Sequence, residues 1–254
     1  MIIAIDIGNT NIVIGGISDR KTVFECRIST DLNKTRDEYT VLLKQLFEIY
    51  KISENDVEGS IISSVVPPVT GSLKRAVEIL TGVKPMEVSV KMKHNIKIVT
   101  DNPEQIGSDL LVAAVSALDE FKPPLAIIDM GTATTITVIG KDNELLGVSI
   151  MPGVKISQEA LVNRTSKLPS ISFEAPESVI GTNTPDSMKS GLIFGNASMI
   201  DGMLDRIEES LGEKINAVAT GGLSGSIIKH CKRNIKIDDE IMIKGLLSLY
   251  ERNK

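Results

Sequence analysis

Residues 1–16 read MIIAIDIGNTNIVIGG, and the rest of the chain can be interpreted from this segment. The apolar run Ile2–Ile5 has the β-branched composition of a buried strand, and it ends at Asp6. A second apolar run, Ile12–Ile14, begins shortly after Gly8, so the residues between the two runs form the turn of a β-hairpin. The turn therefore gathers a carboxylate, a glycine and small polar side chains at one end of two strands.

This turn has two interpretations. In the first, glycine and asparagine are present because tight turns need positive φ angles and side chains that bond their own backbone, and Asp6 is a solvated strand end. In the second, the turn binds a phosphate: Gly8 lets the phosphate approach the backbone, the Thr10 hydroxyl bonds its oxygens, and Asp6 holds Mg²⁺ directly or through water. One copy does not decide between them.

A second copy of the pattern occurs at residues 125–140, which read LAIIDMGTATTITVIG. Both segments place an aspartate and a glycine between two apolar runs. At an offset of 123 positions (129 − 6) three positions coincide: Asp6 with Asp129, Gly8 with Gly131 and Asn9 with Thr132. Because unrelated turns do not usually repeat their flanking strands, the pattern indicates an internal duplication, and it favours the phosphate-binding interpretation and a chain of two domains.

The composition favours small-molecule chemistry. The chain has 254 residues, 42% hydrophobic and 24% charged, which is enough to bury a sizeable core. Its net charge is −5 and it has no basic run, so it lacks the electrostatic footprint of a protein that binds nucleic acid or an anionic membrane. With no signal-type leader after Met1 and no apolar stretch long enough to span a bilayer, the sequence predicts a cytoplasmic location.

Several common site types are not indicated. Cys26 and Cys231 lie far apart without companion ligands, so neither a disulfide framework nor a zinc site is expected. His94 and His230 lie outside any nucleophile motif, which argues against a histidine-dependent triad. No G-x-x-x-x-G-K-[ST] segment occurs, so phosphate binding would not use a P-loop.

Strand and helix patterns alternate along the chain and predict an α/β fold with mixed central sheets and flanking helices. The break at Phe121–Pro124, just before the second hairpin, is the predicted domain boundary. This gives an N-terminal domain of residues 1–121 and a C-terminal domain of residues 122–254.

The segment DNPEQIGSD, residues 101–109, leads into a helix. Pro103 could occupy the first position of that helix, or Gly107 could mark a later start. In both cases an apolar stripe forms on one face, and Asp109 points away from it at 100° per residue. The carboxylate is therefore either a reactive group facing a ligand or a solvated acid in the first turn.

Two glycine patterns in the second half remain open. A long helix over about residues 187–211 carries Gly191, Gly195 and Gly202, a spacing that suits close packing in the core or at a subunit interface. A strand at residues 215–220 runs into Gly221–Gly222, which is either a tight strand-to-helix turn or a place where a ligand lies against bare backbone.

Taken together, seven motifs resemble those of the type III pantothenate kinases, and they keep their order over nearly the whole chain. They are DIGNTN from Asp6, ISSVVPP from Ile62, DNPEQIGSD from Asp101, DMGTATT from Asp129, the Pro152–Gly153 step, GTNTPDSMKSG from Gly181 and ATGG from Ala219. The family belongs to the superfamily of acetate and sugar kinases, Hsp70 and actin. The resemblance therefore implies two ribonuclease-H-like domains, in agreement with the duplication.

The resemblance also implies an ATP site and two cation sites. The expected ATP and phosphate contacts are Asp6, Ile7, Gly8, Asn9, Thr10, Asn11, Ile12, Val13, Gly131, Thr132, Gly221 and Gly222. Asp6 is the carboxylate associated with Mg²⁺, directly or through water, and Asp129 is the ligand of a monovalent cation, K⁺ or NH₄⁺.

The activity implied is the ATP-dependent phosphorylation of pantothenate to 4′-phosphopantothenate, the first step of coenzyme A biosynthesis. Asp109 matches the general base of the family. The matching substrate positions are Thr100, Gly107, Ser108, Asp109, Leu110 and Thr184, the last of which reaches across the interface of a homodimer in the family.

One departure from the family pattern affects the substrate positions. The usual Gly-Ala-Asp-Arg is Gly107-Ser108-Asp109-Leu110 here, so leucine replaces an arginine that bonds pantothenate, and Thr100 stands where many members have tyrosine. Leucine cannot make a charge-assisted hydrogen bond. Two alternatives therefore stay open: a non-catalytic homologue that binds nucleotide or pantothenate and has a regulatory role, and a kinase of another small hydroxylated substrate.

Overall fold

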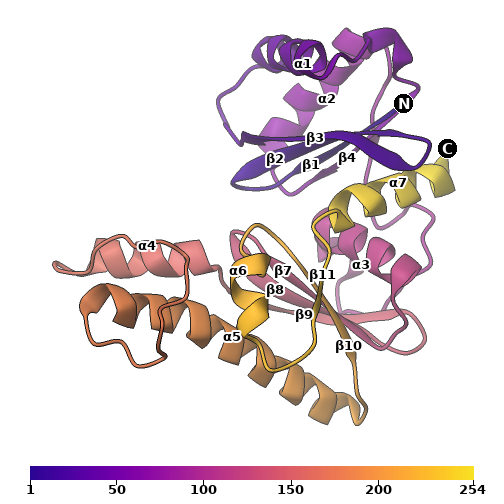
Figure 1. Ribbon diagram of the computed structural model, residues 1–254. Coiled ribbons are helices and arrows are strands. Elements are labelled where there is room, and N and C mark those ends of the chain that lie inside the picture. Colours follow the sequence, from indigo (N-terminus) through magenta and orange to yellow (C-terminus); the bar gives the residue numbers. More distant parts are fainter. The chain divides into compact units, whose positions relative to one another are not determined.

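The computed structural model describes residues 1–254, and the chain forms two compact units. Unit 1 consists of Met1–Asn95, Asp101–Asp119 and Glu240–Lys254. Unit 2 consists of Ile96–Thr100 and Glu120–Asp239. Each unit contains one mixed sheet with helices packed against it (Figure 1).

The sheet of unit 1 has five strands in the order β3-β2-β1-β4-β5. The strands are β1 (Ile2–Ile7), β2 (Asn11–Ser18), β3 (Lys21–Ser29), β4 (Gly59–Ser64) and β5 (Met86–Glu87). β1, β2 and β3 form an antiparallel meander, whereas β4 lies parallel to β1 and β5 lies parallel to β4. The predicted first hairpin is therefore the centre of this sheet.

Helices lie on both faces of the unit 1 sheet (Figure 1). They are α1 (Arg36–Tyr50), α2 (Pro67–Thr81), α3 (Ser108–Glu120) and α7 (Ile241–Asn253), with short 3₁₀ turns at Glu54–Asp56 and Pro103–Gln105. α1 begins at a capping box, in which the Thr35 side chain accepts from Glu38 N–H and the Glu38 carboxylate accepts from Thr35 N–H. α1 and α2 cover one apolar face of the sheet, where the alternating side chains of Ile3, Ile5 and Ile7 are buried.

The C-terminal helix α7 belongs to unit 1, and it packs on β1 and β4. Three glycines make room for it: a Cβ atom at Gly59 would overlap the Tyr250 ring, one at Gly15 would meet Ile243, and one at Gly245 would overlap the backbone of α3. The compact units thus differ from the predicted ranges 1–121 and 122–254 at Ile96–Thr100, at residues 120–121 and at Glu240–Lys254, the segment that contains α7.

The six-stranded sheet of unit 2 repeats the plan of unit 1. Its strands are β6 (Lys97–Ile98), β7 (Leu125–Met130), β8 (Ala133–Ile139), β9 (Glu144–Pro152), β10 (Asn216–Thr220) and β11 (Lys236–Ile237). The order β11-β10-β7-β8-β9-β6 contains the same succession as β5-β4-β1-β2-β3, with β7-β8-β9 antiparallel and β10 parallel to β7. The topology therefore agrees with a duplication inferred from two hairpins.

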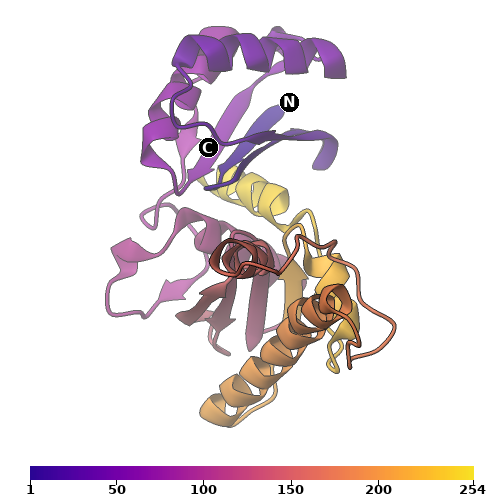
Figure 2. The same ribbon diagram turned by 90° about the vertical axis from the view of Figure 1, so that its left-hand side faces the viewer.

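Helices α4 (Val154–Arg164), α5 (Thr184–Leu211) and α6 (Ser224–Ile227), with the 3₁₀ turn Ile228–His230, complete unit 2. α5 is the long helix in orange, and α4 lies beside its N-terminal half (Figures 1 and 2). The core joins the sheet residues Ala126, Ile128 and Ile136 to Ile193 and Ile200 of α5. None of the helices combines the length and apolar character needed to cross a bilayer.

Candidate active site

The first hairpin places Asp6 at the end of β1. Asp6 lies opposite Val13 of β2 on one side and Ser63 of β4 on the other. The turn is closed by a 3.0 Å hydrogen bond from Gly8 N–H to the Asn11 carbonyl. The Thr30 hydroxyl also donates to the Gly8 carbonyl at 2.6 Å, which ties the turn to the segment after β3. Asn9 and Thr10 are exposed at the tip of this closed turn.

Asp109 lies in the first turn of α3, and the Leu110 N–H donates to its Oδ1 at 2.8 Å. Burial raises the pKa of the Asp109 carboxyl, and hydrogen bonds from backbone N–H groups oppose that rise. A Cβ atom at position 107 would overlap Asp109 Oδ1. Gly107 therefore leaves the space that the carboxylate occupies.

Ser108, the first residue of α3, is bonded to the end of β4. Its Oγ donates to the Ser64 carbonyl at 2.9 Å, accepts from Ser64 N–H at 3.0 Å and lies 3.0 Å from Ser63 Oγ. Ser63 is the neighbour of Asp6 in the parallel pair of β4 and β1. Two predicted site residues, Asp6 and Asp109, are thus attached to the same end of the unit 1 sheet.

The second hairpin is shorter than the first by one residue. β1 and β2 are joined by Gly8, Asn9 and Thr10, whereas β7 and β8 are joined by Gly131 and Thr132 alone. A 3.1 Å hydrogen bond from Gly131 N–H to the Ala133 carbonyl closes this turn, and Gly131 and Thr132 are exposed. The offset of 123 positions therefore holds up to Thr132 and fails beyond it.

Asp129 occupies in unit 2 the position that Asp6 has in unit 1. It lies opposite Thr135 of β8 and Thr220 of β10. Gly221 follows Thr220 with a φ of 97°, and a Cβ atom there would lie 2.6 Å from the Met130 carbonyl carbon. The glycine is thus required by its backbone conformation and by its contact with the end of β7, which brings the predicted residues Asp129 and Gly221 to the same end of the sheet.

Asn183 caps α5, because its side chain accepts a hydrogen bond from Asp186 N–H at 3.0 Å. Thr184 is the first residue of the helix, and its side chain is exposed. It lines a cavity of about 680 Å³ in unit 2. The walls combine apolar and polar side chains, namely those of Leu161, Leu168, Thr182, Asn183, Ser187, Met188 and Leu192 together with Gly181 and Gly191. Thr100, by contrast, follows β6, and its buried hydroxyl has no hydrogen-bond partner.

Residues 2–206 match the family model described as type III pantothenate kinase. The chain belongs to this family. Type III pantothenate kinases from Finegoldia magna and Bacillus cytotoxicus are 41% and 39% identical to it, and each alignment covers 100% of this chain and 98% and 97% of the relative, respectively. The predicted family is therefore confirmed.

Two solved structures share the fold at low sequence identity. Component A of (R)-2-hydroxyglutaryl-CoA dehydratase from Acidaminococcus fermentans has a TM-score of 0.56 at 15% identity, and the match covers 98% of this chain and 96% of that one. The inorganic polyphosphate/ATP-glucomannokinase from Arthrobacter sp. has a TM-score of 0.51 at 12% identity, with the same coverage. Together with the two mixed sheets, these likenesses confirm the predicted α/β fold class of two ribonuclease-H-like, actin-like halves.

This pantothenate kinase has no cluster of three or more His, Cys, Asp or Glu side chains that could hold a metal ion. Asp6 and Asp129 are single carboxylates at strand ends. Mg²⁺ in phosphoryl-transfer sites is commonly bound by one or two carboxylates plus substrate phosphates rather than by a cage of protein ligands. The carboxylate of Asp6 is therefore of a type that fits a magnesium ion binding together with ATP.

Two features of the pantothenate kinase site were missed by sequence reasoning. A Cβ atom at Gly153 would overlap the Thr132 carbonyl, so this glycine allows the start of α4 to approach the second hairpin. The sequence shows only a Pro-Gly step before a helix. The contact of Ser108 with Ser63 and Ser64 was also missed, because it joins residues 44 and 45 positions apart.

Proposed function

We propose that Asp109 is the general base in the transfer of the γ-phosphoryl group of ATP to the primary hydroxyl of pantothenate. The observation that carries this assignment is the attachment of Asp109, through Ser108, to the sheet end that bears Asp6. Family membership supports pantothenate as the acceptor and ATP as the donor. The product is 4′-phosphopantothenate, from which coenzyme A biosynthesis proceeds.

Asp109 accepts the hydroxyl proton as the pantothenate oxygen bonds to the γ-phosphorus and the bond from that phosphorus to the ADP oxygen breaks. Burial favours this role, because a carboxylate with a raised pKa is the stronger base. Asp6 would hold a divalent ion, which when bound would supply positive charge to the phosphate oxygens. Asp6 and the turn amides orient the triphosphate, and Gly107 keeps the space around the base open.

We propose that residues of both hairpins and the glycines after β10 bind ATP. The residues are those of the first hairpin, Asp6–Val13, with Gly131, Thr132, Gly221 and Gly222. The two closed turns support this, since each exposes small side chains and backbone at a strand end that also carries an aspartate. Mg²⁺ is assigned to Asp6 and K⁺ or NH₄⁺ to Asp129.

The substrate positions are Gly107–Leu110, Thr100 and Thr184. Because Leu110 stands where the family pattern has arginine, we expect this chain to bind pantothenate more weakly. The missing charge-assisted hydrogen bond is worth about 1.5–3 kcal/mol. The Leu110→Arg variant therefore lowers the KM for pantothenate. No comparison favours a non-catalytic role or another substrate.

We also propose a homodimer, formed through α4, the loop after it and the N-terminal half of α5. Four large apolar side chains of α4 and this loop are exposed, those of Ile156, Leu161, Val179 and Ile180. Exposed apolar side chains that gather in one region suit an interface between subunits. The cavity beside Thr184 lies in the same region. A cytoplasmic location stays a prediction.

The assignment of the base is tested with Asp109→Asn in an ATP-consumption assay with pantothenate, in potassium and in sodium buffer. Loss of a general base lowers turnover by about 10²- to 10⁴-fold, while ATP binding measured by calorimetry persists. Glu104→Gln is the matched control, because Glu104 precedes the same helix and its side chain is 77% exposed. Near-normal turnover by Asp109→Asn would contradict the assignment, and equal rates in the two buffers would contradict the monovalent cation.

A further inference from the structure

The hydroxyl of Ser108 makes three contacts, and their hydrogen-bond roles can be assigned. Its single proton goes to the Ser64 carbonyl at 2.9 Å, and one lone pair accepts the Ser64 N–H at 3.0 Å. Because a hydroxyl has one donor and two acceptor sites, Ser63 must donate its own proton to Ser108 across their 3.0 Å contact. The donor site and both acceptor sites of the Ser108 hydroxyl are thus used to join α3 to the last two residues of β4.

The end of β4 is itself firmly held. Ser64 Oγ accepts from the Thr70 hydroxyl at 2.7 Å and from Val66 N–H at 3.0 Å, which ties it to the first turn of α2. Ser63 is completely buried and lies beside Asp6 in the adjacent strand. Ser108 is therefore anchored to a part of the sheet that two other contacts fix in place.

The anchored turn carries Asp109. The carboxylate accepts from Leu110 N–H at 2.8 Å, so its orientation follows the orientation of the first turn of α3. An alanine at position 108 would remove all three contacts at once. Without the Ser108 hydroxyl, the buried Ser63 hydroxyl and the Ser64 N–H would lack these partners, which favours a shift of the turn.

We propose that Ser108 is a positioning residue: through Ser63 and Ser64 its hydroxyl fixes the first turn of α3, and thereby holds the Asp109 carboxylate in register with the β1 end that carries Asp6. The inference rests on the proposed role of Asp109 as base. It assigns to Ser108 an effect on turnover rather than on nucleotide affinity, because Ser108 acts on the base.

The test compares steady-state kinetics of the full chain and its variants with pantothenate and MgATP. Misplacement of a reacting group lowers kcat, and for Ser108→Ala we expect a loss of about tenfold or more. The KM for ATP stays within about twofold of the parent value, because only transition-state positioning is lost. Ser108→Thr retains the hydroxyl and restores kcat.

Two further variants separate positioning from stability. Ser116→Ala is the matched control: its hydroxyl lies on the same helix, is buried and has no partner, so its removal leaves kcat unchanged. Ser63→Ala lowers kcat less than Ser108→Ala, and the double variant resembles Ser108→Ala alone, because Ser63 acts through Ser108. If Ser108→Ala fails to fold, Ser63→Ala alone provides the comparison.

A Ser108→Ala variant with normal kcat would overturn the proposal, whether or not its melting temperature falls. Equal losses in Ser108→Ala and Ser116→Ala would also overturn it, since both would then reflect the packing of α3. A parent protein that does not phosphorylate pantothenate would instead refute the proposed function, and this inference with it.

Discussion

The environment of Asp109 favours one of the two interpretations that the sequence leaves open for it, the reactive group facing a ligand. A solvated acid in the first turn of a helix would have an ordinary or lowered pKa. Burial instead raises the pKa of Asp109 above its ordinary value of 3.8. The ionised carboxylate is therefore less stable here than in water, as suits a base that must accept a proton.

We expect Asp109 to titrate above pH 3.8 in the folded protein, and kcat/KM to fall as pH decreases through that raised pKa, because only the ionised carboxylate accepts the proton. The measurement is a ¹³C NMR titration of aspartate carboxyl carbons, with the Asp109 signal assigned by its absence in Asp109→Asn. A midpoint at or below 3.8 would return Asp109 to the class of solvated helix acids.

Residue-level reasoning from sequence reached Asp109 but not its support. The helical period predicts that Asp109 faces away from the apolar stripe, and the paired hairpins predict Asp6 and Asp129. Neither the helical period nor the paired hairpins point to Ser108 or Gly153. The partners of these two residues lie on other elements, and no sequence period or spacing connects a residue with its partner. Such contacts depend on how strands and helices are placed, which a single sequence does not state.

At the scale of elements, strong local sequence signals are sufficient to locate the start of a helix. The capping box at Thr35 gives the start of α1 and the Pro67–Pro68 step gives the start of α2. α5 begins at Thr184, three residues before the predicted start near Ser187, because Asn183 caps the helix and Pro185 fits its first turn. Of the two alternatives before Asp109, the later start occurs: α3 begins at Ser108, directly after Gly107, whereas Pro103 opens a separate 3₁₀ turn.

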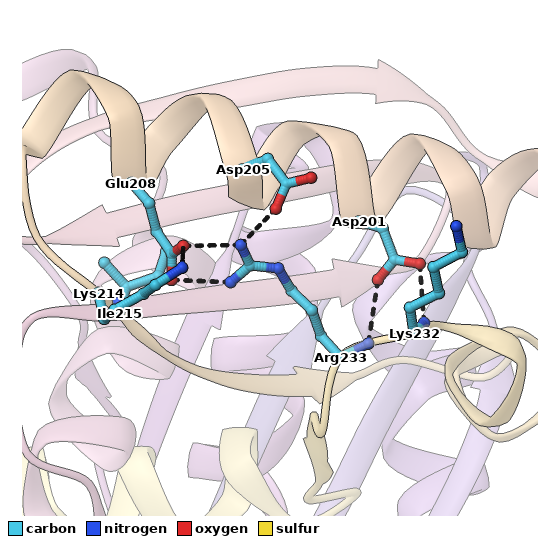
Figure 3. A network of polar contacts seen from close by, with 7 residues as sticks. All are labelled: Asp201, Asp205, Glu208, Lys214, Ile215, Lys232 and Arg233. Carbon is cyan, nitrogen blue, oxygen red and sulfur yellow. Dashed lines mark hydrogen bonds and ion pairs between the residues drawn. The ribbon is translucent and has the colours of Figure 1, made fainter.

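The C-terminal end of α5 is fixed by an ion-pair network, shown in Figure 3. Arg233 bonds both carboxylate oxygens of Glu208, at 2.8 and 2.7 Å, and also contacts Asp205. Glu208 further accepts from Lys214 at 2.7 Å and from the backbone N–H of Ile215 at 3.1 Å. The network joins α5 to the two residues just before β10 and to the segment before β11.

Replacing Arg233 with methionine should lower the free energy of unfolding by about 2 kcal/mol, because the bidentate charged hydrogen bonds to Glu208 are lost. Lys232→Met is the matched control: its side chain is exposed and points away from the network, and its backbone N–H bonds Asp201 in either case. Urea unfolding at neutral pH measures both variants. Equal effects of the two substitutions would show that the network contributes nothing beyond one lost surface charge.

The same network sets the pH dependence of this difference. Hydrogen bonds from Arg233 and Lys214 lower the pKa of Glu208 below its ordinary value of 4.5. A lowered carboxyl pKa contributes stability that is complete above the unfolded pKa and is lost as pH falls toward the folded one. The difference in free energy of unfolding between the parent protein and Arg233→Met therefore becomes smaller below about pH 4.5.

At the scale of the whole molecule, the sequence predicts a duplicated plan and the strand orders agree with it. The final helix is the main difference, since α7 follows β11 of unit 2 in sequence but packs on β1 and β4 of unit 1. Its apolar spacing predicts a packed helix without stating which sheet it covers. The information lies instead in Gly15 and Gly59, which leave room for Ile243 and Tyr250.

The proposed homodimer makes a prediction about subunit mixing. If Thr184 serves the site that contains Asp109 of the partner subunit, Asp109→Asn and Thr184→Arg are each inactive alone but restore activity when co-expressed with different tags. In a mixed dimer one site carries both defects and the other carries neither. Random pairing makes half the dimers mixed, so about a quarter of all sites are intact, and turnover should recover to about a quarter of the parent value.

A double variant provides the matched control for that experiment. When a chain carrying both Asp109→Asn and Thr184→Arg is co-expressed with the parent chain, a shared site leaves every mixed dimer inactive, and only parent dimers turn over, about a quarter of the total. A site built within one chain would leave about half of the sites active in this control and would give no recovery from the single variants. That pair of results would show that Thr184 does not contribute to the active site of the partner subunit. Catalysis would then not require a dimer formed through the exposed residues of α4.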